Sequence, residues 1–496
     1  MPSLCRFVDF VLPILQNFIP MMTRIPLRYP FLATLVLLAV ATSPAAQPAS
    51  TPVTSFKFQF GADKAAPGYT LVAPTLQYSK ETGYGFEPGV KLEAVTQKNA
   101  DLLHTGAVTS TQPFQFSVAV PEGNYRVTVT LGDPVTETVA TVKSERRRLM
   151  LEHVQTAAGQ FVTRSFLVNV RTPKISTGGE VDLNDREHDK ATGAINTLNW
   201  DDRLTVGFSG SDPALAALEI EKVNDVITLF ILGDSTVTDQ GGGGSWGQMA
   251  PRWFGPGVVV ANHAESGETL KGFLMHRRWD KVLDSLKPGD YVVIEFGTND
   301  SKNSGPQNMY AGQDFSVTYA EPNTTYRELL RQFAADVRAK GGNPIIASPS
   351  ARRGETGNPS TLGAWAAAAM ATAKEVGVPG IDLNTLGMQL NTALGADAEK
   401  QFADRTHHSE YGAYLQAKCI VYGIKQANLP LAKYIVSDFG NFDPKHPEPL
   451  PGNFSLPVDV RPGGRGARGP RGGAPGAPAP ADPSAPAAPG TAPKAP

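Results

Sequence analysis

The sequence predicts an α/β protein in which an antiparallel β-sandwich domain is followed by a doubly wound parallel sheet. Two observations lead to this fold class. In residues 56–223, short alternating or apolar stretches are broken by Gly, Pro and Asn without a strong helical period, which is typical of an antiparallel sandwich. In residues 226–428, strands alternate with helical segments, which is the signature of a parallel sheet covered by helices.

The length of the chain, 496 residues, is too great for one typical domain and predicts two or three. We expect a signal-peptide region, the β-sandwich, the α/β domain and a disordered tail at residues 1–47, 54–223, 224–445 and 446–496. The tail is nearly all Pro, Ala and Gly from Arg461 onward, so it cannot form a core.

The N-terminus predicts export. Two arginines precede an apolar segment at residues 31–40 and a run of small residues that ends at Ala46, which is the layout of a secretory signal peptide. A spanning helix needs about 20 apolar residues, so we expect a secreted or periplasmic protein with no stable membrane partner. The sequence leaves open whether translation starts at Met1, Met21 or Met22, and whether the N-terminus stays as an anchor.

Composition excludes several classes of function. The formal net charge of −2 argues against general nucleic-acid binding, and no zinc-ligand spacing is present, so we expect no cofactor and no metal. Only Cys5 and Cys419 occur, and Cys5 lies in the part expected to be removed, so the fold depends on a large core and not on disulfides. The apolar surroundings of Cys419 predict a buried core thiol.

Strands of the N-terminal domain are predicted at residues 56–60, 114–120, 125–131, 161–170, 204–208 and 217–220. Gly83-Tyr84-Gly85-Phe86, the turn at residues 121–125 and the closing Asn199-Trp200 resemble the galactose-binding-like modules that are attached to carbohydrate enzymes.

In the α/β domain, residues 226–232 are apolar and β-branched, as is typical of a strand covered on both faces. Further strands are predicted at residues 291–296 and 344–347, and helices at residues 326–340, 363–376 and 411–426. The first helix has apolar residues at helical spacing and ends at Gly341-Gly342.

The first strand of this domain ends on Gly233-Asp234-Ser235. Ligands of open α/β sheets bind beyond the carboxyl ends of the strands, so Ser235 is a candidate nucleophile, whereas Asp234 faces the other way and is predicted to be structural. Three further blocks follow: residues 262–267 (Asn-His-Ala-Glu-Ser-Gly), Gly297-Thr298-Asn299-Asp300 and Asp404-Arg405-Thr406-His407.

In this order, the four blocks resemble the SGNH, or GDSL-type, hydrolases, a family of esterases and deacetylases with a flavodoxin-like α/β fold. In ester hydrolysis Ser235 would attack, His407 would take and return its proton, and Asp404 would orient the imidazole. A spacing of three lets acid and base converge from one turn. It also favours His407 over the adjacent His408, which we expect to be a wall or surface residue.

The candidate oxyanion hole consists of the backbone amides of Ser235 and Gly267 and the side-chain amide of Asn299. Each such donor is typically worth about 2.7–4 kcal/mol in the barrier. Gly267 by itself could be a simple turn glycine, but Asn262 five residues earlier makes it resemble the second block of the family. Asn299 follows a strand that ends at the same sheet edge as Ser235.

Within the superfamily, the chain resembles the rhamnogalacturonan acetylesterases, which remove acetyl groups from pectin. The resemblance rests on residues 233–239, 246–248, 296–302 and 350–353. It implies an acetylated plant cell-wall polysaccharide as the partner, and we expect a monomer. Family members often carry histidine at the position of Thr298, a departure that bears on substrate preference more than on the chemistry.

Three side chains are candidates for substrate binding. Arg352 and Arg353 either pair with a carboxylate of rhamnogalacturonan or are solvated loop residues. Trp246 either stacks on a sugar ring or packs under the glycine-rich loop at residues 240–244.

The sequence supports three hypotheses. The first is an exported deacetylase of acetylated pectin. The alternative is a general SGNH esterase, a deacetylase of another glycan such as xylan, or a lipid or acyl esterase. The third, a non-catalytic sugar-binding protein, predicts the loss of Ser235, Asn299, Asp404 or His407, and all four are present.

Overall fold

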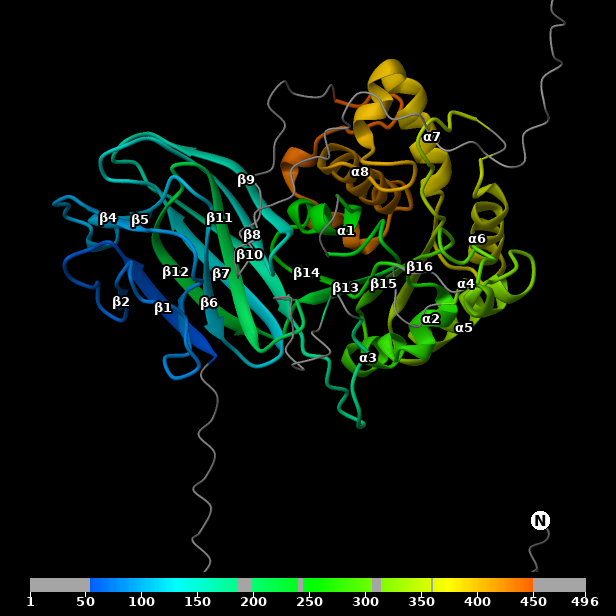
Figure 1. Cartoon of the computed structure of the whole chain (residues 1–496), viewed down its shortest axis with the longest axis horizontal. Helices are drawn as coiled ribbons and strands as arrows, with labels where there is room; N and C mark the ends of the chain where they lie inside the picture. The colour runs from blue at the N-terminus through cyan, green and yellow to red at the C-terminus, as the bar shows by residue number, and fades with distance from the viewer. Residues whose placement is uncertain are drawn as a thin grey trace, which may run out of the picture. The chain divides into compact units, whose positions relative to one another are not determined.

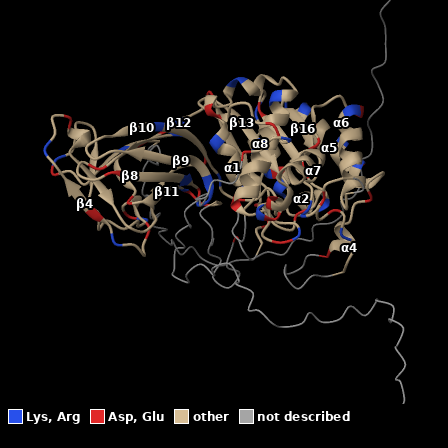
Figure 2. Cartoon of the chain, turned by 90° about the horizontal axis from the view of Figure 1, so that it is seen from above, with Lys and Arg blue, Asp and Glu red and all other residues tan. Residues whose placement is uncertain are grey.

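The computed structural model describes residues 54–184, 187, 199–239, 244–305, 314–357 and 360–448. The predicted signal-peptide region and almost all of the predicted tail lie outside the described residues, as does most of the glycine-rich loop at residues 240–244. Within these ranges, no helix is long and apolar enough to cross a membrane. Figure 2 shows Lys and Arg interspersed with Asp and Glu over the described elements, in keeping with the near-neutral net charge.

Two sheets make up the N-terminal β-rich domain. The first contains β1 (Ser55–Phe60), β2 (Thr70–Val72), β4 (Glu93–Thr96), β5 (Gly106–Thr109), β7 (Gly123–Leu131), β10 (Val162–Val170) and β12 (Ala214–Val223). The second contains β3 (Tyr84–Phe86), β6 (Phe114–Ala119), β8 (Thr138–Ser144), β9 (Arg148–Thr156) and β11 (Arg203–Ser211). One hydrophobic cluster draws on both sheets, with the rings of Phe60 and Phe116 5.2 Å apart.

Strand order within these sheets is β10-β7-β12-β1-β2, with β5 on β12 and β4 on β5, and β3-β6-β11-β8-β9. The pairings between these strands are antiparallel, apart from the parallel pair β1 and β2.

The third sheet has five parallel strands in the order β14-β13-β15-β16-β17. These are β13 (Ile227–Leu232), β14 (Val258–Asn262), β15 (Tyr291–Glu295), β16 (Asn343–Ala347) and β17 (Gly380–Ile381). The α-helices are α1 (Trp246–Met249), α2 (Leu270–Met275), α3 (Arg278–Ser285), α4 (Phe315–Thr318), α5 (Thr325–Ala339), α6 (Gly363–Glu375), α7 (Leu383–Leu394) and α8 (Glu410–Gln426). Short 3-10 helices are η1 (Leu102–His104), η2 (Ala250–Trp253), η3 (Gly395–Gln401), η4 (Pro430–Tyr434) and η5 (Ser437–Phe439).

Apolar side chains project from both faces of the parallel sheet. Because successive residues of a strand point to opposite faces, Ile231 joins a cluster with residues of α1 and α8, and Leu232 joins a different cluster with residues of α3 and α5. Figure 1 shows α1 and α8 above the strands and α2, α3 and α5 below them. All five residues of β15 are buried, as expected for a strand covered on both sides.

Most predicted elements are present. The six predicted strands of the N-terminal domain overlap β1, β6, β7, β10, β11 and β12, and the predicted helices correspond to α5, α6 and α8. The sequence analysis predicted no strand at β9 or β14, nor at β2, β3, β4, β5, β8 and β17. In β9 three consecutive apolar residues follow Arg148 without the alternation of a half-buried strand, and the burial of Leu149 depends on contacts with the α/β domain that no local pattern reports.

Strand β9 joins the β-rich domain to the α/β domain. Although β9 is at the end of its sheet, Arg148 and Leu149 are 1% and 0% exposed. Leu149 belongs to the same hydrophobic cluster as Trp246 of α1. Further along the strand, Glu152 accepts a hydrogen bond of 2.9 Å from the hydroxyl of Tyr414 on α8. The α/β domain thus covers a strand edge that would otherwise be open to other chains.

Shortening Leu149 tests this contact. Because Leu149 is fully buried in the core of the α/β domain, Leu149→Ala is expected to lower the free energy of unfolding by about 2–5 kcal/mol. Urea denaturation followed by tryptophan fluorescence measures this change. Gln155→Ala, at an exposed position of the same strand, is the control. A loss below about 0.5 kcal/mol for Leu149→Ala would contradict the contact.

Candidate active site

Ser235 follows β13 in a tight turn. Gly233 has no room for a side chain, since an added Cβ would lie 2.4 Å from Val237 Cγ2 and 2.6 Å from the carbonyl oxygen of Glu295. The carbonyl oxygen of Asp234 accepts the N–H of Val237 at 3.0 Å, which closes the turn directly after the strand. This turn leaves Ser235 half-buried beyond the carboxyl end of the sheet.

A continuous hydrogen-bonded chain connects the predicted nucleophile, base and acid. Ser235 Oγ lies 2.9 Å from His407 Nε2, and Nδ1 of the same ring lies 2.7 Å from Asp404 Oδ2. The other oxygen of Asp404 accepts the backbone N–H groups of Thr406 and His407 at 2.7 and 2.8 Å. Acid and base therefore come from one short turn, as their spacing predicts.

The environment of Asp404 fixes the tautomer of His407. Burial raises the pKa of Asp404, but hydrogen bonds from the backbone and the ring of His407 outweigh burial and hold it below its usual range. The ionised carboxylate accepts Nδ1–H, so Nε2 remains as an acceptor for the proton of Ser235. This is the arrangement that general-base catalysis requires.

Asn299 and Gly267, the other predicted oxyanion donors, lie in neighbouring loops. Asn299 Nδ2 donates to the carbonyl oxygen of Glu268 at 3.1 Å, and its Oδ1 accepts from Lys302 Nζ at 2.6 Å. These two bonds fix the amide plane of Asn299, and an amide nitrogen carries a second N–H. Gly267 has a φ of +86°, a conformation that side chains disfavour. The structure therefore brings both predicted donors to adjacent loops beside β13.

Two buried carboxyl groups lie beneath the nucleophile turn. Thr236 Oγ1 is 3.0 Å from Asp234 Oδ1 and 3.1 Å from Glu295 Oε2. Burial and the nearby Asp234 raise the pKa of Glu295 well above its usual range. Burial also raises the pKa of Asp234, and the hydroxyl of Thr236 lies within hydrogen-bond distance of both carboxyl groups. Asp234 is structural, in agreement with the sequence prediction.

A buried ion pair holds the segment that follows the turn. Arg148 Nε lies 2.7 Å from Asp239 Oδ2, with the two side chains 1% and 2% exposed. Asn262 Nδ2 donates to Asp239 Oδ1 at 2.6 Å and to the carbonyl oxygen of Val237 at 2.7 Å. A side chain of β9 is therefore connected through two residues to the turn that carries Ser235.

Cationic side chains gather near the site. Burial and the neighbouring Arg405 lower the pKa of Arg352, and burial, with a smaller effect from Arg352, lowers the pKa of Lys302. Arg353 instead lies 3.5 Å from Glu399. The structure therefore brings Arg352 together with Lys302 and Arg405, and pairs Arg353 elsewhere. The sequence analysis gave Lys302 and Arg405 no role, although both lie within the recognised blocks.

Two expectations about nearby aromatic rings are corrected. Trp246 is 0% exposed and belongs to the core beneath α1, so its ring has no free face for a sugar. His408 is not a surface residue, since it is fully buried with its ring 5.0 Å from that of Phe402. Burial lowers the pKa of His408 to about 4, so the ring is neutral at pH 7. Cys419 is buried, as the sequence predicts.

Two family models match separate parts of the chain. Residues 231–415 match the GDSL-like lipase/acylhydrolase family. Residues 56–162 match the family described as β-agarase/YXIM esterase-like, galactose-binding domain-like. In the described parts of the chain, no group of three or more His, Cys, Asp or Glu could hold a metal ion.

Relatives include rhamnogalacturonan acetylesterase RhgT of Bacillus subtilis (strain 168), which is 33% identical over 237 residues, covering 43% of this chain and 96% of RhgT. The uncharacterized esterase YxiM of the same organism is 26% identical over 398 residues, covering 75% of this chain and 91% of YxiM. The crystal structure of the YXIM protein of Bacillus subtilis matches with a TM-score of 0.39 at 23% identity, covering 76% of this chain and 99% of that structure.

Fold and relatives together define a carboxylic ester hydrolase. The chain belongs to the GDSL-like lipase/acylhydrolase family, and its SGNH-hydrolase fold is preceded by a β-rich, galactose-binding-like domain. The predicted membership of the SGNH superfamily is confirmed.

Removing the side chain that holds Asn299 tests the oxyanion arrangement. Lys302→Met leaves Asn299 Oδ1 without its donor, so we expect kcat for a small acetate ester to fall about tenfold with little change in KM. Steady-state kinetics measure this. Lys302→Arg keeps a donor and is expected to retain more activity, and Lys374→Met, exposed on α6, is the control. An unchanged kcat in Lys302→Met would refute the role.

The buried His408 predicts a loss of stability in acid. Its pKa is about 4 when folded and about 6.5 when unfolded, so the unfolded state binds the proton more readily as the pH falls from 6.5 towards 4. The free energy of unfolding therefore falls by roughly 3 kcal/mol as the pH decreases across that window. Urea denaturation at several pH values should show a smaller acid loss for His408→Gln than for the wild type. His446→Gln, whose ring is exposed, should behave like the wild type.

Proposed function

We propose that the chain is an exported serine esterase that removes O-acetyl groups from the pectic polysaccharide rhamnogalacturonan, with Ser235, His407 and Asp404 as its catalytic residues. The observation that carries the proposal is the unbroken hydrogen-bonded chain, with Ser235 Oγ to His407 Nε2 at 2.9 Å and His407 Nδ1 to Asp404 Oδ2 at 2.7 Å. Rhamnogalacturonan is the substrate in the name of the relative RhgT.

In the first half of the reaction, Ser235 Oγ attacks the acetyl carbonyl carbon while His407 Nε2 takes the hydroxyl proton. The carbonyl oxygen becomes an oxyanion that accepts hydrogen bonds from Asn299 Nδ2 and from the backbone amides of Ser235 and Gly267. When the intermediate collapses, the bond to the sugar oxygen breaks and His407 returns the proton to it. The products are a free sugar hydroxyl and an acetylated Ser235.

In the second half, water attacks the acetyl group on Ser235 and His407 again serves as the base. The side chains of His407 and Asp404 are 42% and 57% exposed, so water reaches the base without a conformational change. Acetate leaves and the proton returns to Ser235 Oγ. Asp404 stays ionised throughout and stabilises the imidazolium.

The charge around the site supports an anionic polymer as the substrate. Lys302 and Arg352 both lie near enough to Asp234, which precedes Ser235, for its charge to affect their pKa values, and Arg405 affects that of Arg352 in the same way. Rhamnogalacturonan carries carboxylates that such guanidinium groups bind in bidentate geometry. The exposure of His407 and Asp404 suits a chain that lies across the surface. A long acyl chain would instead require an apolar groove.

We also propose the domain boundaries 1–47, 54–223, 224–445 and 446–496, with export of a monomer to the periplasm or medium. The hydrophobic cluster shared by the two antiparallel sheets supports a β-sandwich, and the clusters on both faces of the parallel sheet support a doubly wound arrangement. The strand order β14-β13-β15-β16-β17 has the 2-1-3-4-5 pattern of flavodoxin-like sheets.

The decisive experiment measures acetate release from acetylated rhamnogalacturonan and from acetylated xylan. We expect the wild type to prefer rhamnogalacturonan. Ser235→Ala should reduce the rate by about 10³-fold or more, because it removes the nucleophile. Equal release by the variant would contradict the role of Ser235 as the nucleophile. Activity confined to xylan would contradict the assignment of rhamnogalacturonan as the substrate but not the mechanism.

Arg405→Ala separates substrate recognition from chemistry. Arg405 is exposed, so its removal should leave the fold intact. KM for rhamnogalacturonan is expected to rise, while kcat and KM for a small neutral acetate ester should stay at wild-type values. Equal effects on both substrates would count against recognition of the polymer by charge.

A further inference from the structure

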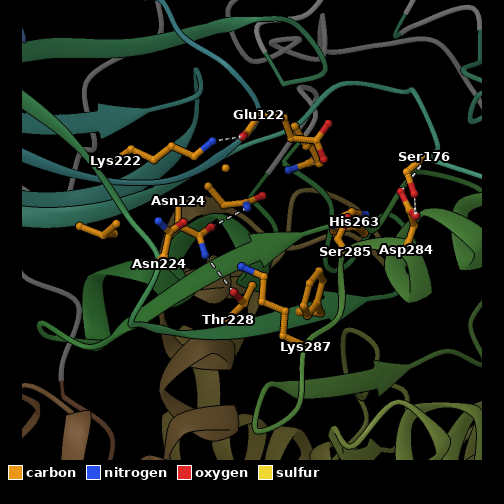
Figure 3. A pocket seen from close by; sticks show the side chains of 15 residues that line it. Glu122, Asn124, Ser176, Lys222, Asn224, Thr228, His263, Asp284, Ser285 and Lys287 are labelled. Carbon is orange, nitrogen blue, oxygen red and sulfur yellow. Dashed lines mark hydrogen bonds between the residues drawn. The ribbon is translucent and has the colours of Figure 1, made fainter. Parts of the chain in front are cut away.

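A cavity lies outside the candidate active site. Its volume is about 380 Å³, and its lining includes none of Ser235, Asn299, Asp404 and His407. Strands β7, β10 and β12 of the β-rich domain contribute to its wall, together with β13, α3 and the residue after β14 of the α/β domain (Figure 3). Pockets of about 300–1,000 Å³ typically hold small molecules.

Buried polar atoms in this wall have no hydrogen-bond partner among the described residues. Arg171 is 3% exposed, and neither Nε nor Nη1 is paired in that part of the chain. His263 is 1% exposed, and its Nδ1 is likewise unpaired there. Asn169 Oδ1 is unpaired in the described residues as well. Unpaired buried polar groups cost free energy, and these three side chains line one cavity, so they favour a polar ligand over an apolar one.

The charge balance around Arg171 favours an anion. Arg148 and Arg171 share one carboxylate, that of Asp239, at 2.7 and 3.9 Å. Burial raises the pKa of Glu145 to about 8, so Glu145 is mostly uncharged at pH 7. Burial and Arg148 lower the pKa of Arg171 to about 9, which leaves it charged at that pH. Glu187, the other carboxyl group that acts on Arg171, pairs with Arg278, so among the described residues Arg171 has no carboxylate of its own.

The wall as a whole has one more cationic than anionic side chain. Arg171, Lys222 and Lys287 stand against the carboxylates of Glu122 and Asp284. Glu122 already pairs with Lys281 at 2.6 Å. Figure 3 shows Lys287 near Thr228 and Asn124, on the side of the cavity away from Ser176 and Asp284. The ammonium of Lys287 makes no hydrogen bond within the described ranges.

The uncharged part of the wall suits hydroxyl groups. Asn124 Nδ2 donates to Thr228 Oγ1 at 3.0 Å, and Asn169 Nδ2 donates to Asn124 Oδ1 at 2.8 Å. This chain orients Asn169 so that its Oδ1 is left as an acceptor. The ring of Phe230, 5.5 Å from that of His263, supplies an apolar surface. Amides, an imidazole and one aromatic ring beside a guanidinium match a polyhydroxylated carboxylate.

We propose that this cavity binds a sugar acid of monosaccharide size, with its carboxylate on Arg171 and Lys287 and its hydroxyls on Asn169 and His263. The proposal is independent of the catalytic role of Ser235, because the ligand occupies a different cavity. It assigns a ligand to the junction of the two domains.

Calorimetric titration of the full chain with D-galacturonate tests the proposal, with D-galactose as the uncharged analogue. Because a carboxylate on a buried guanidinium makes charge-assisted hydrogen bonds, galacturonate is expected to bind at least about tenfold more tightly than galactose. Equal affinities would overturn the proposal. The absence of binding would also overturn it, and would mean that the cavity holds water only.

Two variants locate the bound sugar acid. Arg171→Gln removes the buried charge and should abolish the preference for galacturonate. Lys287→Glu changes an exposed residue, so the fold should persist while the affinity falls about tenfold. Lys374→Glu makes the same change on α6, outside the cavity, and should leave binding at the wild-type value. Wild-type affinity in Lys287→Glu would place the ligand elsewhere and refute the proposal, even if Arg171→Gln fails to fold.

Discussion

The buried ion pair between Arg148 and Asp239 is the interaction on which the arrangement of the active site depends. Removing one partner of a buried pair leaves an uncompensated charge and typically costs about 3–5 kcal/mol. Asp239 also accepts a hydrogen bond from Asn262, which donates in turn to the carbonyl oxygen of Val237, two residues after Ser235. The β-rich domain is therefore part of the structure that positions the nucleophile.

The carboxyl groups around Ser235 have pKa values shifted in opposite directions because their environments differ. Asp404 is exposed and receives three hydrogen bonds from Thr406 and His407, which hold its pKa below the usual range. Glu295 is fully buried near another carboxyl group, and its pKa is raised well above the usual range. An ionised Asp404 can stabilise an imidazolium, whereas the raised pKa of Glu295 disfavours a further negative charge beneath the nucleophile.

Local patterns in the sequence predicted the elements and the residues that lie close in the chain. The apolar patterns of β13, β15, α5 and α8 were sufficient to predict these elements. The order of the four sequence blocks predicted that Ser235 and His407 lie together. The pair Arg148 and Asp239 could not be predicted, because its members are 91 residues apart and neither stands in a periodic pattern. For Trp246 the sequence left both sugar stacking and interior packing open, because it reports that a ring is amphipathic but not which surface covers it.

Leu149 has a consequence for how this architecture can change in evolution. Its side chain belongs to the β-rich domain by sequence and to the core of the α/β domain by contact. Deletion of the β-rich domain would open a hole lined by apolar groups on the remaining domain. Such a lineage would need compensating substitutions before the shortened protein became soluble. The two domains are thus expected to be kept together in evolution. Deleting the coding region of the β-rich domain alone would not yield a soluble hydrolase domain.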